Sequence, residues 1–211
     1  LRGKIAQKKG MSAFIRELFA TRFSSTEEEV QQAMLAADNE LFGGGVVAVG
    51  DISNFPVSAG IKEQSRLQYH TFVEVLGLAP ARAAEAISNG KTLRQLFSSG
   101  KQTASIAPHA PYSLSDELFA ALAQLNDNHP STIHSEESED EWEFCTKGTR
   151  SFAALFQSMG IDLSTFTPTP QLTPLQRVLE RIGTQRPFIF VHNTLMRQEE
   201  FDQIEDRKSV V

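Results

Sequence analysis

Three short apolar segments of this chain each lead into a histidine, and this recurrence limits the fold more than any other feature. The histidines are His109, His134 and His192, out of five in the whole sequence. The segments before them are rich in apolar and β-branched residues and are followed by turn or helix signals, which is typical of buried strands. A fold that gathers the carboxyl ends of several strands would bring these imidazoles together.

Five strands of this kind alternate with helical segments along the chain. Such alternation predicts an α/β fold with a parallel sheet. The first strand is an unbroken apolar run, which predicts burial on both of its faces. The predicted strands are Val46 to Val49, Tyr69 to Leu76, Thr103 to Ala107, Ser131 to His134 and Pro187 to Val191.

The intervening segments carry helix signals. Met11 to Arg22 has an apolar face at helical spacing, which we expect to be buried. Ser25 and Thr26 precede three glutamates, and an N-cap hydroxyl with acids in the first turn should begin a second helix that runs to about Leu41. The expected buried face of the first helix carries Phe14, Ile15, Leu18 and Phe19. Further helices are expected over Ala79 to Phe97, Ser115 to Leu125, Glu137 to Lys147, Arg150 to Met159, Pro174 to Ile182 and from Arg197 onward.

A parallel sheet with helices can be either doubly wound or closed into a barrel. No GxGxxG or GxxxxGK segment occurs, which weakens the case for a nucleotide-binding doubly wound sheet. In a barrel the active site collects at the carboxyl ends of many strands, where the three histidines stand. The pattern therefore favours a (β/α) TIM-type barrel with a site at its rim.

The segment Ser131 to Trp142, STIHSEESEDEW, carries the strongest chemical signal. His134 ends a strand, and Glu137 follows three residues later, so a metal ligand and a proton carrier could surround one water molecule. Taken alone, a strand-end histidine is more often structural, and an acidic run is more often a solvated helix face. The two other strands that end in histidine favour the functional interpretation.

Composition excludes several classes of protein. Lys plus Arg number 20 against 26 Asp plus Glu, and the densest basic stretch, Arg2 to Lys9, is short, so we expect no nucleic-acid partner. The one cysteine, Cys145, excludes an intramolecular disulfide and a cysteine-based zinc knuckle. No apolar run reaches membrane-spanning length, so we expect no membrane association and a cytoplasmic location.

Several motifs together resemble one family. APHAPYS at Ala107 to Ser113, IHSEE at Ile133 to Glu137, FVHN at Phe190 to Asn193 and VGDISN at Val49 to Asn54 are similar to segments of the amidohydrolase superfamily. The likeness is to the branch with guanine deaminase, triazine hydrolases and aminofutalosine deaminase-like proteins. It extends over Leu1 to Glu205, which implies that this range is part of an amidohydrolase barrel.

The resemblance implies roles for single residues. His134 would be a metal ligand from the fifth barrel strand, and Glu137 would shuttle protons between a metal-bound water and the leaving group. His192, after the sixth strand, would orient the water or the substrate. His109 would contact the substrate, with Tyr112 near it. Apart from the resemblance, Glu74 is a further predicted substrate contact, because a carboxylate between Val73 and Val75 needs a partner or a functional reason to be buried. The implied cofactor is one divalent metal, zinc, with iron as the alternative.

The chain also departs from the family pattern. Family members bind the metal with a His-x-His pair after the first strand and an Asp after the eighth, and neither occurs here. We therefore expect an incomplete (β/α)8 barrel, approximately strands two to six, that would be inactive by itself. Residues 206–211, DRKSVV, match the translation of a common sequencing adapter, so we predict a non-native tail there.

Three functions are carried forward from the sequence. The leading one is a metal-dependent deaminase of an aminated heterocycle or nucleoside, similar to aminofutalosine. Another is a hydrolase of the same branch that acts on guanine or a triazine, and the third is a metal-free scaffold homologue. In the two enzyme cases the partner is a small-molecule substrate, and a homodimer is the assembly to test for the full-length protein.

Other polar residues have weaker claims. We predict that His70 and His129 are structural and that Cys145 is a packing residue. Asp51 and Asn54, placed in the loop after the first predicted strand, could cap that loop or bind a ligand, and Trp142 could line the site or pack.

Overall fold

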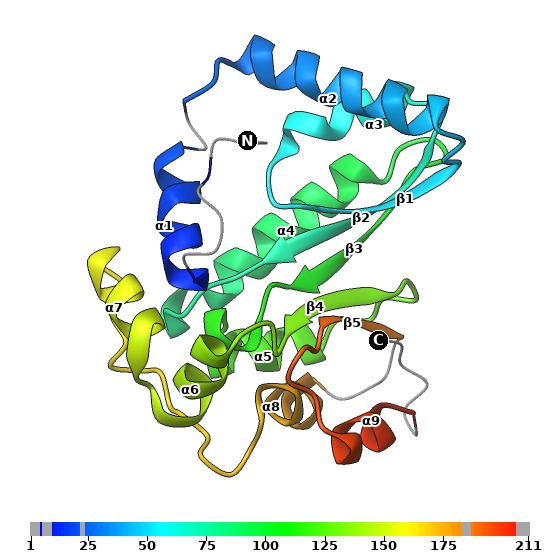
Figure 1. The fold of residues 1–211 in the computed structure, drawn as a ribbon. Coiled ribbons are helices and arrows are strands. Elements are labelled where there is room, and N and C mark those ends of the chain that lie inside the picture. The colour runs from blue at the N-terminus through cyan, green and yellow to red at the C-terminus, as the bar shows by residue number, and fades with distance from the viewer. Residues whose placement is uncertain (1–4, 6–9, 22–23, 183–186, 206–211) are drawn as a thin grey trace.

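The computed structural model describes residues 5, 10–21, 24–182 and 187–205, and it has a mixed α/β fold with parallel strands (Figure 1). The strands form one sheet in the order β1-β2-β3 and a second sheet of β4 and β5. All pairings are parallel, which confirms the predicted fold class. The strands are β1 Ala48–Ser53, β2 Gln68–Val75, β3 Thr103–Pro108, β4 Ser131–Ser135 and β5 Phe188–His192.

Helices connect successive strands, as expected for parallel pairs. The first two, α1 Met11–Thr21 and α2 Glu27–Gly43, precede β1. The later α-helices are α3 Ala59–Gln64, α4 Ala83–Phe97, α5 Asp116–Ala123, α6 Glu139–Lys147, α7 Arg150–Ser158, α8 Pro174–Ile182 and α9 Gln198–Glu205. Short 3-10 turns are η1 Pro56–Ser58, η2 Pro80–Arg82 and η3 Pro111–Ser113.

The two sheets lie against each other at β3 and β4. The backbone N–H of His134 donates to the carbonyl of His109 at 2.9 Å. The hydroxyl of Ser131 donates to the carbonyl of Ile106 at 3.1 Å. The five strands therefore follow one another in chain order, which is consistent with an arc of a parallel barrel. Their assignment to barrel strands two to six stays a prediction.

The core lies between the strands and the helices that cover one of their faces. In β2 the side chains of Val73 and Val75 are buried, while His70 and Glu74, on the opposite face, are only partly buried. Helices α4, α5 and α8 supply the apolar partners of the buried face, so burial follows the alternation of a half-covered sheet. The main cluster includes Val75, Ile87, Ile106, Leu118, Leu122, Ile133, Val178, Leu179, Phe188 and Phe190.

The first strand differs from its prediction. It begins at Ala48 and runs through Gly50, Asp51 and Ile52 to Ser53, residues that we had placed partly in a loop. It alternates between exposed and partly buried residues, and Val47 just before it is 77% exposed. The expected burial on both faces is wrong, because β1 is an edge strand whose one partner among the described residues is β2.

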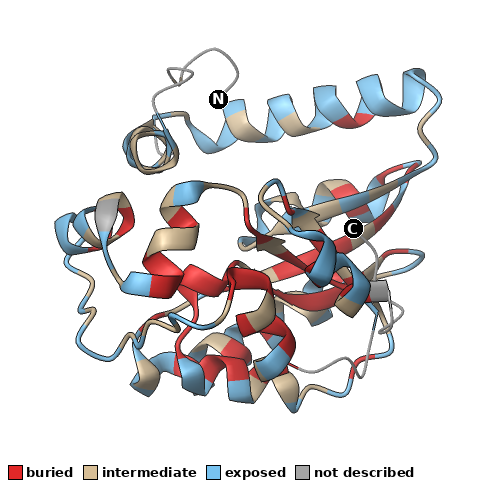
Figure 2. Ribbon diagram, turned by 60° about the horizontal axis from the view of Figure 1, so that its bottom comes forward, coloured by how far each residue is buried: buried red, intermediate tan, exposed pale blue. Residues whose placement is uncertain are grey.

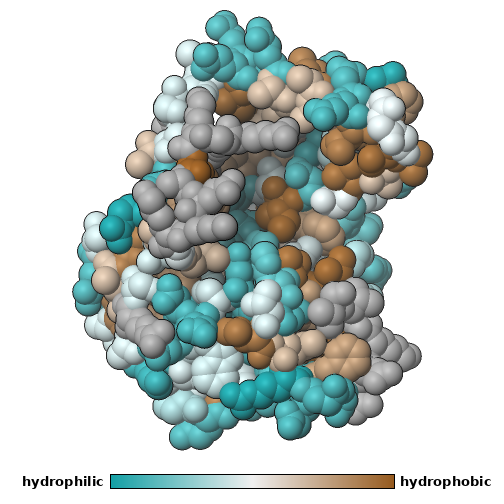
Figure 3. Space-filling model, in the orientation of Figure 1, coloured by the Kyte–Doolittle hydropathy of each residue, from teal (hydrophilic) through white to brown (hydrophobic). Residues whose placement is uncertain are grey.

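Apolar side chains gather at this edge. Figure 3 shows hydrophobic residues where the end of α2 meets β1. Leu41, Phe42, Val47 and Ile52 are all exposed there. An apolar patch beside an unpaired strand edge is a surface that further chain or a partner usually covers.

The two N-terminal helices lie away from the sheets. Helix α1 has no buried residue, and Phe14 and Phe19 are 43% and 42% exposed, so the predicted burial of that face is wrong. Its partly buried contacts, Met11 and Ile15, lie against the cluster around Phe152. Figure 2 shows that α2 is also exposed along most of its length.

Helix α2 begins as predicted. Thr26 is its N-cap, and the Thr26 hydroxyl and the Glu29 carboxylate form a capping box. The one buried residue of α2 is Asp38, which accepts hydrogen bonds from Ser65 at 2.6 Å and Tyr69 at 2.9 Å. These bonds tie α2 to the end of α3 and to β2.

The segment between β1 and β2 was not predicted to be helical, yet it forms η1 and α3. The proposed tail, residues 206–211, lies outside the described residues, so that prediction stands as it was. Within the described part of the chain, no helix combines the length and the apolar character needed to span a membrane.

Candidate active site

The three strand-end histidines and Glu74 lie together at one end of the strands. His109 follows β3, His134 lies in β4, His192 ends β5, and Glu74 lies near the end of β2. The ring centroids of His109 and His134 are 5.5 Å apart, and those of His134 and His192 are 5.1 Å apart. Parallel strands bring their carboxyl ends to the same edge, and here they bring four ionisable side chains with them.

Three of these side chains could hold a metal ion. Glu74, His109 and His134 each offer a ligand atom, and these atoms all lie within 4.8 Å of one another. The Nε2 atom of His134 is 3.7 Å from Oε1 of Glu74. That distance is too long for a hydrogen bond, but one cation could lie between the two atoms at usual zinc distances of about 2.0–2.2 Å.

A hydrogen bond sets the tautomer of His109. The Ser113 hydroxyl donates to the carbonyl of Ala110 at 2.9 Å, so it accepts from Nδ1 of His109 at 2.8 Å. The proton of the neutral ring is then on Nδ1, and Nε2 keeps its lone pair. Burial, with His134 nearby, lowers the pKa of His109 to about 4, so the ring stays neutral near pH 7 and can bind a metal or a proton donor.

The surroundings of the His134 ring also fit a metal ligand. Its Nδ1 atom is buried and has no hydrogen-bond partner among the described residues. Burial, and then His192, lower the pKa of His134. A buried polar atom without a partner costs about 1–3 kcal/mol. The neutral ring, the nearby carboxylate and the second imidazole together fit a divalent cation such as zinc.

The Glu74 carboxylate accepts a hydrogen bond from Asn54, and burial destabilises its ionised form. The Asn54 amide donates to Oε2 of Glu74 at 3.2 Å. Burial raises the pKa of Glu74 to about 7, and the Asn54 hydrogen bond opposes that rise. Its other oxygen, Oε1, faces His134. A cation bound between them would stabilise the ionised form of this buried carboxylate.

Glu137 and His192 form a second pair beside the first group. The Nε2 atom of His192 lies 3.5 Å from Oε1 of Glu137, and both side chains are about one-third exposed, at 33% and 28%. Burial raises the pKa of Glu137, while His192 opposes the shift. A raised pKa makes the ionised carboxylate a stronger proton acceptor.

Two tight turns present these residues. Glu136, His192 and Asn193 have φ angles of 54°, 77° and 48°, and they are the non-glycine residues with positive φ in the described structure. All three lie directly after β4 or at the end of β5, where Glu137 and His192 are placed. Strained backbone of this kind clusters at functional sites and persists where the surroundings hold it.

The remaining predicted contact, Tyr112, is placed differently. Its side chain is 4% exposed, and its ring stacks on Phe152 at 4.5 Å. Its edge-to-face contact with His109 has a centroid distance of 5.5 Å. Burial raises the pKa of Tyr112, so the phenol stays protonated. In this structure Tyr112 supports the His109 ring, and its role as a substrate contact stays a prediction.

Three other candidates, His70, Asp51 and Trp142, lie outside this group of ionisable side chains. His70 has partners on both nitrogens, Thr103 at 2.8 Å and Ser105 at 3.0 Å, which agrees with a structural role. Asp51 lies in β1 and pairs with the buried Lys62 at 2.5 Å, so its predicted place in the loop is wrong. Trp142 lines a cavity of about 340 Å³ beside the site and lies under the Arg197 guanidinium at 5.1 Å.

His129 and Cys145 also have structural surroundings. His129 stacks on His70 with a centroid distance of 5.5 Å, and its Nδ1 atom is 3.3 Å from Asp127. Cys145 is a free, fully buried cysteine in the aromatic cluster with Phe144 and Phe152. Both placements agree with the predictions for these residues.

Sequence reasoning missed two supporting residues, Ser113 as the partner of His109 and Glu141. Glu141 is fully buried, and its carboxylate accepts the backbone N–H groups of Glu136 and Glu137. Burial raises the pKa of Glu141 to about 8, and those two hydrogen bonds oppose the rise. The sequence signal for it was the S-x-x-E pattern from Ser138 to Glu141, which is typical of helix N-termini.

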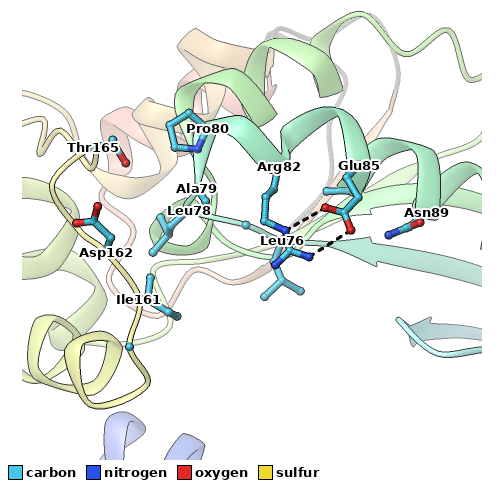
Figure 4. A pocket seen from close by; sticks show the side chains of 13 residues that line it. Leu76, Leu78, Ala79, Pro80, Arg82, Glu85, Asn89, Ile161, Asp162 and Thr165 are labelled. Carbon is cyan, nitrogen blue, oxygen red and sulfur yellow. Dashed lines mark hydrogen bonds and ion pairs between the residues drawn. The ribbon is translucent and has the colours of Figure 1, made fainter.

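A larger cavity, of about 580 Å³, lies outside this group (Figure 4). The loop after β2, the first turns of α4 and the segment 160–165 line it, with Leu78, Pro80 and Ile161 among the apolar residues. Its Arg82 and Glu85 bind each other at 3.0 Å. None of the predicted site residues lines it, so the cavity and the ionisable cluster are separate features.

Neither protein-family models nor curated proteins match this chain. Solved structures do match in fold. The chain is similar to aminofutalosine deaminase from Helicobacter pylori, with a TM-score of 0.78 and 21% identity over 98% of this chain and 50% of that one. A second structure of that enzyme, in complex with methylthio-coformycin, matches with a TM-score of 0.78 and 20% identity over the same shares of the two chains.

Two zinc-containing structures also match. An adenosine deaminase from Xanthomonas campestris with bound zinc has a TM-score of 0.63 and 17% identity over 97% of this chain and 44% of that one. A mutant atrazine chlorohydrolase from Arthrobacter aurescens, complexed with zinc and atraton, has a TM-score of 0.68 and 13% identity over 96% and 47%. These likenesses support the predicted α/β fold with parallel strands, and the chain spans about half the length of each structure.

Proposed function

We propose that this chain belongs to a metal-dependent hydrolase that removes an amino group from a heterocycle or nucleoside. The observation that carries the proposal is the convergence of Glu74, His109 and His134, with the Glu137–His192 pair beside them. The fold matches deaminases and a chlorohydrolase, and the match with the highest TM-score of those described is an aminofutalosine deaminase. An aminofutalosine-like nucleoside is therefore the first substrate to test.

Some of the described residues would bind the metal, and others would transfer protons. His134 is the proposed ligand, through one of its ring nitrogens. Two roles are open to Glu74 and His109, since both lie close enough to complete the metal site or to hold a substrate beside it. When bound, a divalent metal, zinc or alternatively iron, would lower the pKa of a water molecule and polarise the substrate.

Glu137 would carry the protons. Its raised pKa lets it take a proton from the attacking water and return it to the departing amine. His192, 3.5 Å away, would orient the Glu137 carboxyl group and the water. The Nε2 lone pair of His109 would accept a hydrogen bond from the substrate, because Ser113 occupies its Nδ1.

We further propose that the active form is a longer protein that closes the barrel. Strands β1 and β5 each have one strand partner in the described structure, and the matched structures are about twice as long. The residues that would complete the metal site and the substrate pocket would then come from outside this sequence.

The test uses the complete gene product and a panel of substrates. Ammonia release is measured with aminofutalosine, adenosine, guanine and an amino-triazine, and chloride release with a chloro-triazine. The Glu137→Gln variant should keep its bound metal but lose about 10²–10⁴-fold in kcat, because an amide cannot move a proton. Glu139→Gln, an exposed position on α6, is the matched control and should keep wild-type activity.

The outcomes separate the candidate functions. Ammonia from a nucleoside supports the deaminase, whereas chloride from the triazine favours the second hydrolase. A protein that purifies without metal and converts no substrate would favour the scaffold. Near-normal turnover by Glu137→Gln would remove Glu137 from the mechanism.

A further inference from the structure

The turn that carries Glu137 is held by a buried carboxylate. Oε1 of Glu141 accepts the backbone N–H of Glu136 at 3.0 Å, and Oε2 accepts the N–H of Glu137 at 2.8 Å. Glu141 is fully buried, so these bonds do not compete with water. Both oxygens of one side chain are thus committed to two successive residues, of which the second is the proposed proton carrier.

The backbone at this turn needs to be held. Glu136 has a φ of 54°, a conformation that costs an L-residue other than glycine about 1–2 kcal/mol. Without fixed partners, the turn would relax toward ordinary backbone angles. Because Glu137 is the next residue, a change of backbone angles at Glu136 would move the Glu137 carboxyl group away from His192.

A second contact holds the same turn from β5. Thr194 donates its N–H to the carbonyl of Glu136 at 3.0 Å and its hydroxyl to the same oxygen at 2.8 Å. The N–H of Asn193 donates to the carbonyl of Ser135 at 2.9 Å. The turns that present Glu137 and His192 are therefore hydrogen-bonded to each other.

Helix capping alone does not explain Glu141. In the capping box of α2, Glu29 accepts the N–H of its own N-cap residue, Thr26, at 2.9 Å. In α6 the N-cap Ser138 accepts the N–H of Glu141 at 3.3 Å, but the Glu141 carboxylate reaches past Ser138 to Glu136 and Glu137. The same sequence pattern thus caps α2, whereas in α6 its glutamate binds the backbone of the two residues before the N-cap.

We propose that Glu141 is a positioning residue, which holds the Glu136–Glu137 backbone so that the Glu137 carboxyl group stays directed at His192. The inference rests on the proposed function, because it gives Glu137 its catalytic role. Glu141 itself need not touch the substrate or the metal.

The first experiment is independent of activity. Amide hydrogen exchange is measured in the complete protein for wild type, Glu141→Gln and the matched capping variant Glu29→Gln. Glutamine keeps one acceptor oxygen and has an NH2 group in place of the other, so Glu141→Gln should lose protection at one or both of the amides of Glu136 and Glu137, and Glu29→Gln should lose it at neither. Unchanged protection at both amides in Glu141→Gln would overturn the inference. If protection is lost but the complete protein shows no hydrolase activity, Glu141 still holds the Glu136–Glu137 backbone, and the result counts against the proposed function instead.

The second experiment measures catalysis. Glu141→Gln should lower kcat on the order of 10–100-fold with nearly unchanged KM and metal content, since a small misplacement of a catalytic group has effects of this size. A purely structural Glu141 would lower the stability of the fold and leave kcat unchanged, so unchanged kcat or loss of metal would overturn the proposal.

A further variant guards against misfolding. If Glu141→Gln does not fold, Thr194→Ala tests the same turn from an exposed position. It should lower kcat several-fold without changing metal content, and normal kcat in Thr194→Ala would then overturn the proposal.

Discussion

Replacing Glu74 with glutamine should stabilise the metal-free protein above neutral pH. The Glu74 side chain is 11% exposed, and burial raises its pKa from 4.5 to about 7. Glutamine has nearly the same shape, stays neutral at every pH and keeps an oxygen for the Asn54 amide. The substitution therefore removes the buried charge with little change in packing.

The sign and size of the effect follow from proton linkage. Between pH 4.5 and about 7 the folded protein keeps the Glu74 proton while the unfolded chain releases it. The stability contributed by the protonated side chain is therefore complete below pH 4.5 and is lost as the pH rises through about 7. A pKa rise of this size corresponds to about 3 kcal/mol. Glu74→Gln should then match wild type at about pH 4 and be up to about 3 kcal/mol more stable at about pH 8.

The assay is chemical denaturation of the complete protein with a chelator present, at both pH values. Glu117→Gln, an exposed glutamate on α5, is the control and should change little at either pH. Zinc should cancel most of the difference if Glu74 is a ligand, since a ligand at a hundredfold excess over its Kd stabilises the folded wild type by about 2.7 kcal/mol. A Glu74→Gln effect that is the same at both pH values would refute the argument from burial.

Three other predictions test the site and the fold. His134→Ala should lower the metal content measured by elemental analysis, since it removes the proposed ligand; unchanged stoichiometry would exclude His134 as a ligand. Gly90→Ala should destabilise the protein by about 1–3 kcal/mol in chemical denaturation, despite alanine's better helix propensity. The added Cβ would lie 2.8 Å from Cγ1 of Val75, and a stabilised variant would show that α4 can move away from β2. Residues 1–211 expressed alone should aggregate or pack loosely and show no hydrolase activity; a monomer with a cooperative melt and stoichiometric zinc would contradict this.

Local signals in the sequence predicted the elements well. Thr26 and Glu29 marked the start of α2, and the short apolar runs before His134 and His192 became β4 and β5. Capping and strand propensity depend on neighbours within a few positions, so they can be read from one sequence. The convergence of the three histidines also followed from local facts, because each ends a strand and the strands are parallel.

Burial could not be predicted in the same way. The apolar run at Val46 to Val49 and the face of α1 with Phe14 were both expected to be buried, and both are largely exposed. Their patterns were correct for elements with a covering layer, but burial depends on which distant segments pack against an element. The described structure provides no such layer for either.

The sequence by itself determined the order of the strands and of most helices, the fold class and which histidines stand at strand ends. Only the tertiary structure decided that Glu74 joins His109 and His134, that Ser113 sets the His109 tautomer, and that Glu141 holds the turn before its own helix. Periodicity and capping are short-range, whereas these contacts depend on the twist and spacing of packed strands. A carboxylate in a strand or helix acquires its role from the groups that the fold brings within about 3–4 Å of it.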